Sequence, residues 1–179
     1  QFLFSVKTGQ LHPNPVPIIK AGDGDGPRHY CYHPDKNVIY VANENGSSVT
    51  TYQFNPDDGS LKANQTLSTL PDKFGEENTC AQIHLHPSGK FLYVANRGHD
   101  SIAIFSVSDD GENLIAIGRQ ETEPIPRTFN LDPSGSFLFA AGQGSGKLAT
   151  YQIDPETGLL TFLRSQYLGK NPMWVMILE

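Results

Sequence analysis

Cysteine is scarce in this 179-residue chain, which holds only Cys31 and Cys80. Neither belongs to a Cys-x-x-Cys pair, so no zinc or thiol-redox motif is present. Two buried thiols in strands are the simplest interpretation. A single disulfide between the two cysteines stays open as the alternative.

Positive charge and long apolar runs are also in short supply. The 13 Lys and Arg residues face 19 Asp and Glu residues, a net charge of −6, which excludes the basic surface of a sequence-independent nucleic-acid binder. No apolar run approaches the ~18 residues of a membrane-spanning helix. We therefore expect neither a nucleic-acid partner nor a membrane. No secretory signal and no Met open the chain, and we expect a cytoplasmic protein that is a processed product or a fragment.

Turn residues are abundant instead, and they recur at a fixed period. Three similar segments place Pro34, Pro87 and Pro133 in the same turn, 53 and 46 residues apart. A second turn recurs between these segments, with glycines at positions 9, 59, 111 and 158. With 17 Gly, 13 Pro and 10% aromatic residues, the chain has the composition of a turn-rich β protein with a hydrophobic core.

Each repeat contains four short segments of alternating apolar residues. In the second repeat these segments are 80–85, 91–95, 101–107 and 114–119, and no stretch carries a helical stripe. Four strands in 45–50 residues is the period of a β-propeller blade. The sequence therefore predicts an all-β fold, a β-propeller. A sandwich has no reason to repeat its strands at a fixed period.

The predicted blades form one partial propeller domain over 1–179. Three complete four-stranded blades at 26–70, 79–120 and 125–168 lie between partial blades at 1–20 and 171–179. The partial blades hold predicted strands at 2–6, 16–19 and 173–178, the last with Met173 and Trp174 in the core. Propellers close with 4–8 blades. We therefore expect a ring completed by further N-terminal blades or by a homo-oligomer.

Antiparallel strands place alternate loops on opposite faces, and one face gathers chemistry. The innermost strands begin there with Arg28, His29 and Arg127, and the loops after the second strands carry Glu44, Arg97 and His99. Arginine offers a planar fork that suits carboxylate or phosphate, so the expected ligand is a small anion. The alternatives are structural: Arg28 paired with Glu44 or Asp25, Arg97 on loop carbonyls, and His99 shaping its loop.

Other catalytic motifs are missing. The sequence has no Gly-x-Ser-x-Gly elbow, no Walker loop and no GxGxxG in a βαβ context. His84 and His86 lie on the same side of a predicted strand. However, His86 fills the turn position that His33 and Asp132 occupy in the other repeats. We expect no metal and no cofactor.

Several segments resemble one family. These are Gly26-Pro27-Arg28-His29, Tyr40-Val41-Ala42-Asn43-Glu44, the run from Ile83 to Ile102, and Pro126-Arg127-Thr128-Phe129. They are similar to the seven-bladed propeller lactonases, which include propeller-type 6-phosphogluconolactonases and fungal carboxy-cis,cis-muconate cyclases. The resemblance covers nearly the whole chain but only the C-terminal half of the family's length. One departure is Gln82, where the family often has Glu.

The resemblance implies hydrolysis of a small anionic lactone, 6-phosphogluconolactone foremost, at the mouth of the central channel. It implies Arg28, Glu44 and Arg97 as catalytic residues, and a further family histidine that belongs to a blade upstream of this chain. Glu44 is the expected base, and His29 or that upstream histidine is the alternative. The substrate-binding candidates beside them are Arg127, His99, Asn96 and Gln143. A lactone-forming muconate cyclase and a non-catalytic binding scaffold stay open as alternatives.

Overall fold

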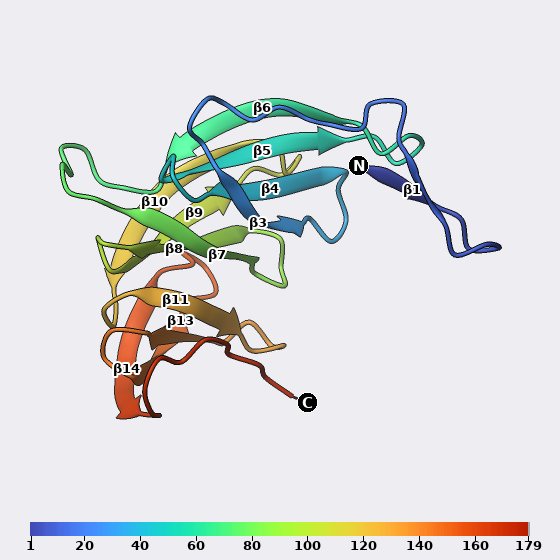
Figure 1. Ribbon diagram of the computed structural model, residues 1–179. Helices are drawn as coiled ribbons and strands as arrows, with labels where there is room; N and C mark the ends of the chain where they lie inside the picture. The colour runs from blue at the N-terminus through green and yellow to red at the C-terminus, as the bar shows by residue number, and fades with distance from the viewer. Residues whose placement is uncertain (179) are drawn as a thin grey trace.

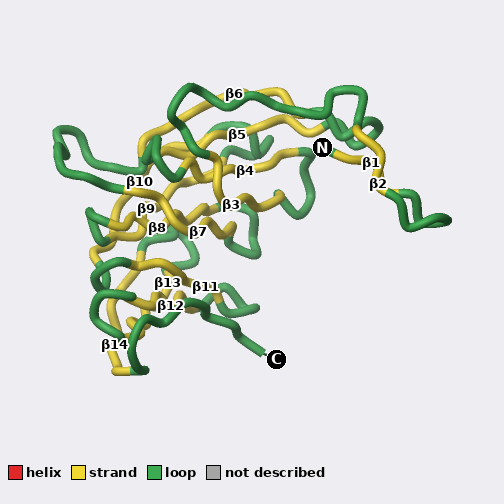
Figure 2. The backbone as a smooth tube through the Cα atoms, in the orientation of Figure 1, coloured by secondary structure: helices red, strands yellow, loops and turns green. Residues whose placement is uncertain are grey.

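The computed structural model describes residues 1–178, which form strands and loops only (Figures 1 and 2). Among these residues no helix is long and apolar enough to cross a membrane. The all-β prediction is confirmed. Each of three sheets has four strands in chain order, every neighbouring pair antiparallel. The first sheet contains β3 (Pro27–Tyr32), β4 (Val38–Asn43), β5 (Ser48–Phe54) and β6 (Leu61–Ser68); the second contains β7 (Thr79–Leu85), β8 (Phe91–Arg97), β9 (Ser101–Val107) and β10 (Leu114–Glu121); the third contains β11 (Pro126–Leu131), β12 (Phe137–Gly142), β13 (Lys147–Ile153) and β14 (Leu160–Tyr167).

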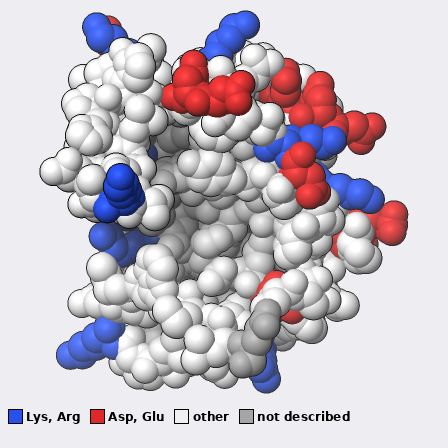
Figure 3. All heavy atoms as spheres, turned by 90° about the vertical axis from the view of Figure 1, so that its right-hand side faces the viewer, with Lys and Arg blue, Asp and Glu red and all other residues white. Residues whose placement is uncertain are grey.

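The three sheets lie side by side like the blades of a propeller, with their first strands innermost (Figure 1). Strand β7 contacts both β3 and β11, so the inner strands of successive sheets are neighbours. Seen from the side on which the two termini lie, the surface is hollowed at its centre (Figure 3). This arrangement brings the starts of β3, β7 and β11 together although they are far apart in the sequence.

The middle sheet is buried on both faces, which explains its nearly continuous apolar sequence. In β8, Phe91, Tyr93 and Ala95 belong to the core against the third sheet. Leu92 and Val94 alternate with them and belong to the core against the first sheet. Successive side chains of a strand point to opposite faces, so one apolar run supplies both cores.

Buried polar side chains of one sheet donate hydrogen bonds to turn carbonyls of the next sheet, at equivalent positions in successive blades. Tyr40 donates its hydroxyl to Gly111 O at 2.7 Å, and Tyr93 donates to Gly158 O at 2.9 Å. His86 Nε2 lies 2.9 Å from Gly135 O and donates to it, because a carbonyl oxygen only accepts. These buried hydrogen bonds fix how each sheet sits against the next.

The N-terminal segment differs from the prediction. Strand β1 (Phe2–Phe4) pairs with β2 (Leu11–Pro13) in a short hairpin, and the strand predicted at 16–19 is absent. Pro15 and Pro17 explain the difference, because proline has no amide hydrogen to donate to a neighbouring strand.

The C-terminal segment also corrects the sequence analysis, because 173–178 forms no strand. Val175 N donates to Thr128 Oγ1, and Asn130 Nδ2 donates to Val175 O, each at 3.2 Å. Contact with β11 thus runs through side chains rather than a backbone ladder. Met173 and Trp174 are 50% and 63% exposed rather than in the core, since no described strand covers them. Glu179, the end of the predicted partial blade, lies outside the described residues.

Candidate active site

Each innermost strand begins with a β-bulge at the same place in its sheet. The register shifts between Pro27 and His29 in β3, between Cys80 and Ile83 in β7, and between Pro126 and Thr128 in β11. A bulge leaves residues outside the ladder and re-aims their side chains. The residues concerned here are Arg28, Ala81, Gln82 and Arg127.

Glu44 lies directly after β4 and its backbone is held from two sides. Its amide donates to Gly26 O at 2.7 Å, and its carbonyl accepts from Cys80 N at 2.9 Å. The loop after β4 is thereby attached to the start of β7. This attachment carries the Glu44 carboxylate from the first sheet towards the second.

The structure brings Arg28, Glu44 and Arg97 together, as the sequence analysis expected. Arg97 Nη2 forms an ion pair and hydrogen bond with Glu44 Oε1. Arg28 Nε lies 3.5 Å from Glu44 Oε2, so one carboxylate bridges two guanidinium groups from neighbouring blades.

Backbone carbonyls hold both arginines in place. Arg28 Nη1 donates to Ala81 O at 2.9 Å, and Arg97 Nη2 donates to Cys80 O at 3.0 Å. Arg97 Nε is buried and has no hydrogen-bond partner among the described residues. The structural alternatives considered for Arg28 and Arg97 are therefore present, and they orient the same two groups towards the site.

The charges of this cluster set its protonation. The hydrogen bond from Arg97 is the main cause that lowers the pKa of Glu44, with the charges of Arg97, Arg28 and Arg127 adding to it. Burial lowers the pKa of His29, and the charge of Arg28 lowers it further. At neutral pH Glu44 is therefore a carboxylate, and His29 is a neutral imidazole that can accept a proton.

Two pockets flank the cluster. The loop pocket, a cavity of about 550 Å³, is lined by Asn45, Glu77, Asn78, Thr79, Arg97, Gly98 and Ile125. The strand pocket, of about 240 Å³, is lined by Arg28, His29, Gln82, Arg127, Met173 and Trp174. Arg97 lines the first pocket and Arg28 the second, so the Glu44 bridge joins them.

Comparison with known proteins identifies the family of the chain. Residues 1–177 match the family model described as lactonase, 7-bladed beta-propeller. The chain belongs to the seven-bladed β-propeller lactonase family. Curated 6-phosphogluconolactonases of Yersinia enterocolitica and Pectobacterium carotovorum are 41% identical over 95% and 96% of the chain. The chain spans about half their length, 51% and 52%.

Solved structures show the same family likeness. A protein from Lactobacillus plantarum superposes with a TM-score of 0.91 at 31% identity, over 99% of this chain and 51% of its own. The periplasmic gluconolactonase of Pseudomonas aeruginosa superposes with a TM-score of 0.84 at 28% identity, over 89% of this chain and 45% of its own. The prediction of a partial propeller from the lactonase family is confirmed.

Gly98 keeps one loop of the candidate site close to its neighbour. Its φ of 125° lies in a region that side chains rarely adopt. A Cβ at this position would lie 2.2 Å from Glu77 O. Glycine after Arg97 thus allows two site loops to approach backbone to backbone.

Asn96, one of the predicted substrate-binding residues, takes a structural role instead. Asn96 is 0% exposed; its Oδ1 accepts from Thr69 Oγ1 at 2.7 Å and its Nδ2 donates to Ser101 Oγ at 3.2 Å. Asn43 does the same in the preceding blade, donating to Ser48 Oγ at 2.9 Å. This repetition is a sequence signal that marks both asparagines as loop supports.

His99 also shapes its loop rather than lining either pocket. Its ring stacks edge-on against Phe74 at a centroid distance of 4.9 Å, and its Nδ1 lies 2.8 Å from Ser101 Oγ. Gln143 lies at the edge of the site, where its Nε2 donates to Met173 Sδ at 3.5 Å. Arg127 is the substrate-binding candidate that lines the strand pocket itself.

Gln82 is the site residue whose role sequence reasoning missed. The sequence marks it only as a departure from the Glu that the family often has, and no motif points to the bulge between Cys80 and Ile83 that places this buried residue in the lining of the strand pocket. Cys31 and Cys80 are free thiols on β3 and β7, as the sequence analysis expected, but Cys80 is buried whereas Cys31 is only half-buried. His84 and His86 both take part in packing between sheets. The ring of His84 lies 4.8 Å from the ring of Phe129, and His86 donates a hydrogen bond to Gly135 O.

His84 predicts a pH dependence of stability. Burial lowers its pKa from 6.5 to about 4, with repulsion by His29 as the second cause. Between these two values the unfolded chain binds a proton that the folded chain does not, so stability falls as the pH falls through this range. We expect His84→Phe to remove about 2–3 kcal/mol of the stability difference between about pH 7 and about pH 4.5.

Denaturant unfolding at the two pH values measures this difference. His12→Phe makes the same change at an exposed position of β2 and should leave the pH dependence as in the wild type. An unchanged acid loss in His84→Phe would show that His84 does not carry it.

Proposed function

We propose that this chain provides the catalytic face of a sugar-lactone hydrolase acting on 6-phosphogluconolactone. The observation that carries the proposal is the Glu44 carboxylate held between Arg28, which lines the strand pocket, and Arg97, which lines the loop pocket. The curated relatives named 6-phosphogluconolactonase support the choice of substrate. The scheme needs no metal and no cofactor.

The reaction adds water to the lactone carbonyl and opens the ring. The water oxygen bonds to the carbonyl carbon while a base takes a water proton, and the carbonyl oxygen becomes negative. Arg28 and Arg97 face that oxyanion and stabilise it, the role of preorganised donors in acyl transfer. The tetrahedral intermediate then expels the ring oxygen, which takes the proton back from the base and leaves as a hydroxyl.

His29 is the base in this scheme, and Glu44 orients the two arginines. A carboxylate flanked by two guanidinium groups is a poor proton acceptor, because its ionised form is strongly stabilised. His29 is neutral at neutral pH, makes no side-chain hydrogen bond within the described residues, and lines the strand pocket beside Arg28. Its free nitrogen is therefore available to the attacking water.

The ring around the site requires further blades. Apolar side chains are exposed on the outer faces of the first and third sheets, including Tyr30 and Tyr32 on β3, Phe137 on β12 and Leu163 on β14. We propose that blades of the same kind cover these faces, supplied by an N-terminal half or by a second copy of the chain. The free thiols are typical of a reducing compartment, and we propose the cytoplasm.

A hydrolysis assay tests the function. With spontaneous hydrolysis subtracted, we expect saturable turnover of 6-phosphogluconolactone and none of carboxy-cis,cis-muconate. His29→Gln should lower turnover by roughly 10²–10⁴-fold, the contribution of a general base. Because its pKa is lowered from 6.5, activity should decline only when the pH falls below that value.

Two outcomes would contradict the proposal. Turnover of the muconate but not of the lactone would assign the site to the cyclase branch of the family. A complete ring without turnover of either substrate would assign the face to binding rather than catalysis.

A further inference from the structure

The loop pocket is the larger of the two cavities at the Glu44 bridge, and the proposed reaction gives it no task. Arg97 belongs to the pocket and to the bridge, because it lines the pocket and holds Glu44 Oε1. The base His29 lines the strand pocket instead. A lactone whose carbonyl oxygen is held by Arg97 therefore has about 550 Å³ of space for the rest of the molecule in the loop pocket.

The Asn78 amide fixes the wall of the loop pocket. Its Nδ2 donates to Ser47 Oγ at 2.9 Å and to Asn96 Oδ1 at 3.2 Å, and its Oδ1 accepts from His99 N at 3.1 Å. These partners come from the first and second sheets, so one side chain ties the loops of two blades together. The pocket is preformed, which lowers the cost of ordering it around a ligand.

Two other lining residues keep free polar groups. Thr79 is paired with Arg97 in the ladder between β7 and β8. Its hydroxyl makes no hydrogen bond within the described residues and is not among the atoms sealed from solvent. The Asn45 amide also has no partner there, and it lies against Gly26, where a Cβ would be 2.8 Å from Asn45 Nδ2. A hydroxyl and a primary amide both donate and accept hydrogen bonds, which suits the hydroxyl groups of a sugar.

The charge of the lining favours a neutral group over an anionic one. The charged residues among those that line the loop pocket are Arg97 and Glu77, and Arg97 already shares its charge with Glu44. The described lining therefore has no surplus positive charge for a phosphate. A neutral, hydroxylated part of a ligand fits these groups better.

We propose that the loop pocket binds the hydroxylated carbons of the substrate and that Thr79 and Asn45 determine the preference for hydroxylated lactones. This inference rests on the proposed lactone hydrolysis. The Thr79 hydroxyl and the Asn45 amide replace water around the substrate hydroxyls. A lactone without hydroxyls leaves both groups unpaired, which is how a site built for a hydroxyl rejects an analogue that lacks it.

Calorimetric titration of the assembled protein with two acids tests the inference without relying on turnover. One acid is 6-phosphogluconate; the other is its deoxy analogue 6-phosphonooxyhexanoate, which has the same chain length, carboxylate and phosphate but no hydroxyls. We expect the wild type to bind 6-phosphogluconate at least ~10-fold more tightly, since several hydrogen bonds are at stake. Thr79→Val should lose ~3- to 10-fold in affinity for 6-phosphogluconate, the scale of one hydrogen bond, and less than ~2-fold for the deoxy analogue.

The controls separate hydroxyl recognition from folding. Thr161→Val makes the same replacement at an exposed position of β14 and should bind both acids like the wild type. Asn45→Ala removes the second polar group from an exposed loop position and serves if Thr79→Val fails to fold. It should show the same selective loss of affinity for 6-phosphogluconate.

Equal binding of the two acids by the wild type would overturn the inference. An equal loss of both affinities in Thr79→Val would overturn it too, because the pocket would then hold a group that the two acids share. Retained preference for 6-phosphogluconate in a ring that does not hydrolyse the lactone would instead contradict the proposed function alone.

Discussion

Replacing Arg97 by alanine should lower lactone hydrolysis by at least ~100-fold, the scale of losing one donor to a developing oxyanion. The Arg97 side chain is 14% exposed and contacts both Glu44 and the carbonyl of Cys80. Its loss removes one of the two guanidinium groups at the bridge. It also frees one Glu44 oxygen and removes the hydrogen bond from Arg97, which is the main cause of the lowered pKa of Glu44. Steady-state kinetics on the assembled protein measure the effect.

Matched variants make the result interpretable. Arg164→Ala removes an exposed arginine of β14 and should leave turnover at the wild-type level. Arg97→Lys keeps the positive charge beside Glu44 but loses the planar fork, so it should fall between wild type and Arg97→Ala. Near-wild-type turnover of a folded Arg97→Ala protein would remove Arg97 from the mechanism.

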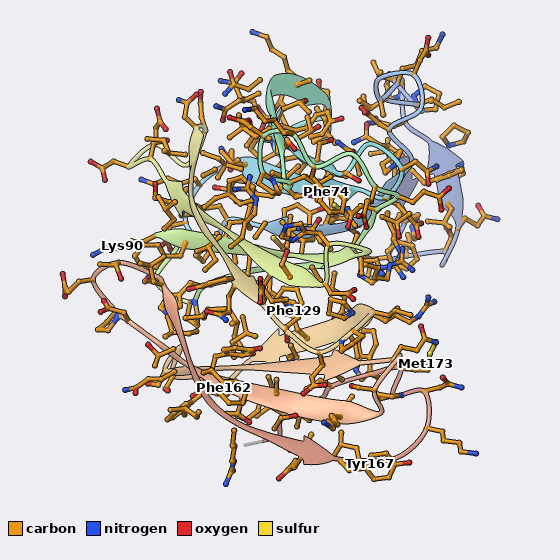
Figure 4. The ribbon with its side chains drawn as sticks, turned by 90° about the vertical axis from the view of Figure 1, so that its left-hand side faces the viewer. Phe74, Lys90, Phe129, Phe162, Tyr167 and Met173 are labelled. Atoms are coloured by element: carbon orange, nitrogen blue, oxygen red, sulfur yellow. The ribbon has the colours of Figure 1, made fainter. Side chains whose placement is uncertain are left out.

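Phe129→Ala should lower the free energy of unfolding by about 3–5 kcal/mol, the usual cost of emptying a buried aromatic site. Phe129 is 0% exposed. It projects from β11 into the space between the second and third sheets (Figure 4), where it meets the ring of His84 at 4.8 Å. The cavity left by alanine cannot collapse without moving one sheet against the other.

Phe162→Ala is the control for this prediction. Phe162 lies on the outermost strand β14 (Figure 4) and is 53% exposed, so the same truncation there should cost much less. Denaturant unfolding at neutral pH measures both variants. A cost for Phe129→Ala no larger than for Phe162→Ala would mean that the two sheets do not share one core.

Strand positions were readable from the sequence where a local rule sufficed. The segment predicted at 101–107 is β9 (Ser101–Val107) in the structure, because alternation and turn residues act within a few positions. The N-terminal hairpin and the extended 173–178 segment were not readable in the same way. Their apolar residues satisfy the strand pattern, but pairing depends on a partner strand that the local sequence does not specify.

The candidate site shows the same division. Gly-Pro-Arg-His and Asn-Arg-Gly pointed to Arg28 and Arg97 through the repeat, and the structure joins both at Glu44. Asn96 lies in the same run and faces inward instead. Strand alternation is interrupted by bulges and loops at this end of the sheets, so position alone did not tell which side chain points to the pocket.

Repeat period, blade type and the end of each sheet that carries the arginines follow from the local pattern, because hydrophobic alternation and turn residues act over few positions. The bridge through Glu44, the aim of Gln82 and the exposure of Trp174 came only from the tertiary structure. Each depends on contacts between blades about 50 residues apart, such as Arg28 with Ala81 and Gln82 with Phe129. Such contacts exist only after the sheets have packed, since the register shifts that aim these side chains are set by neighbours across the interface.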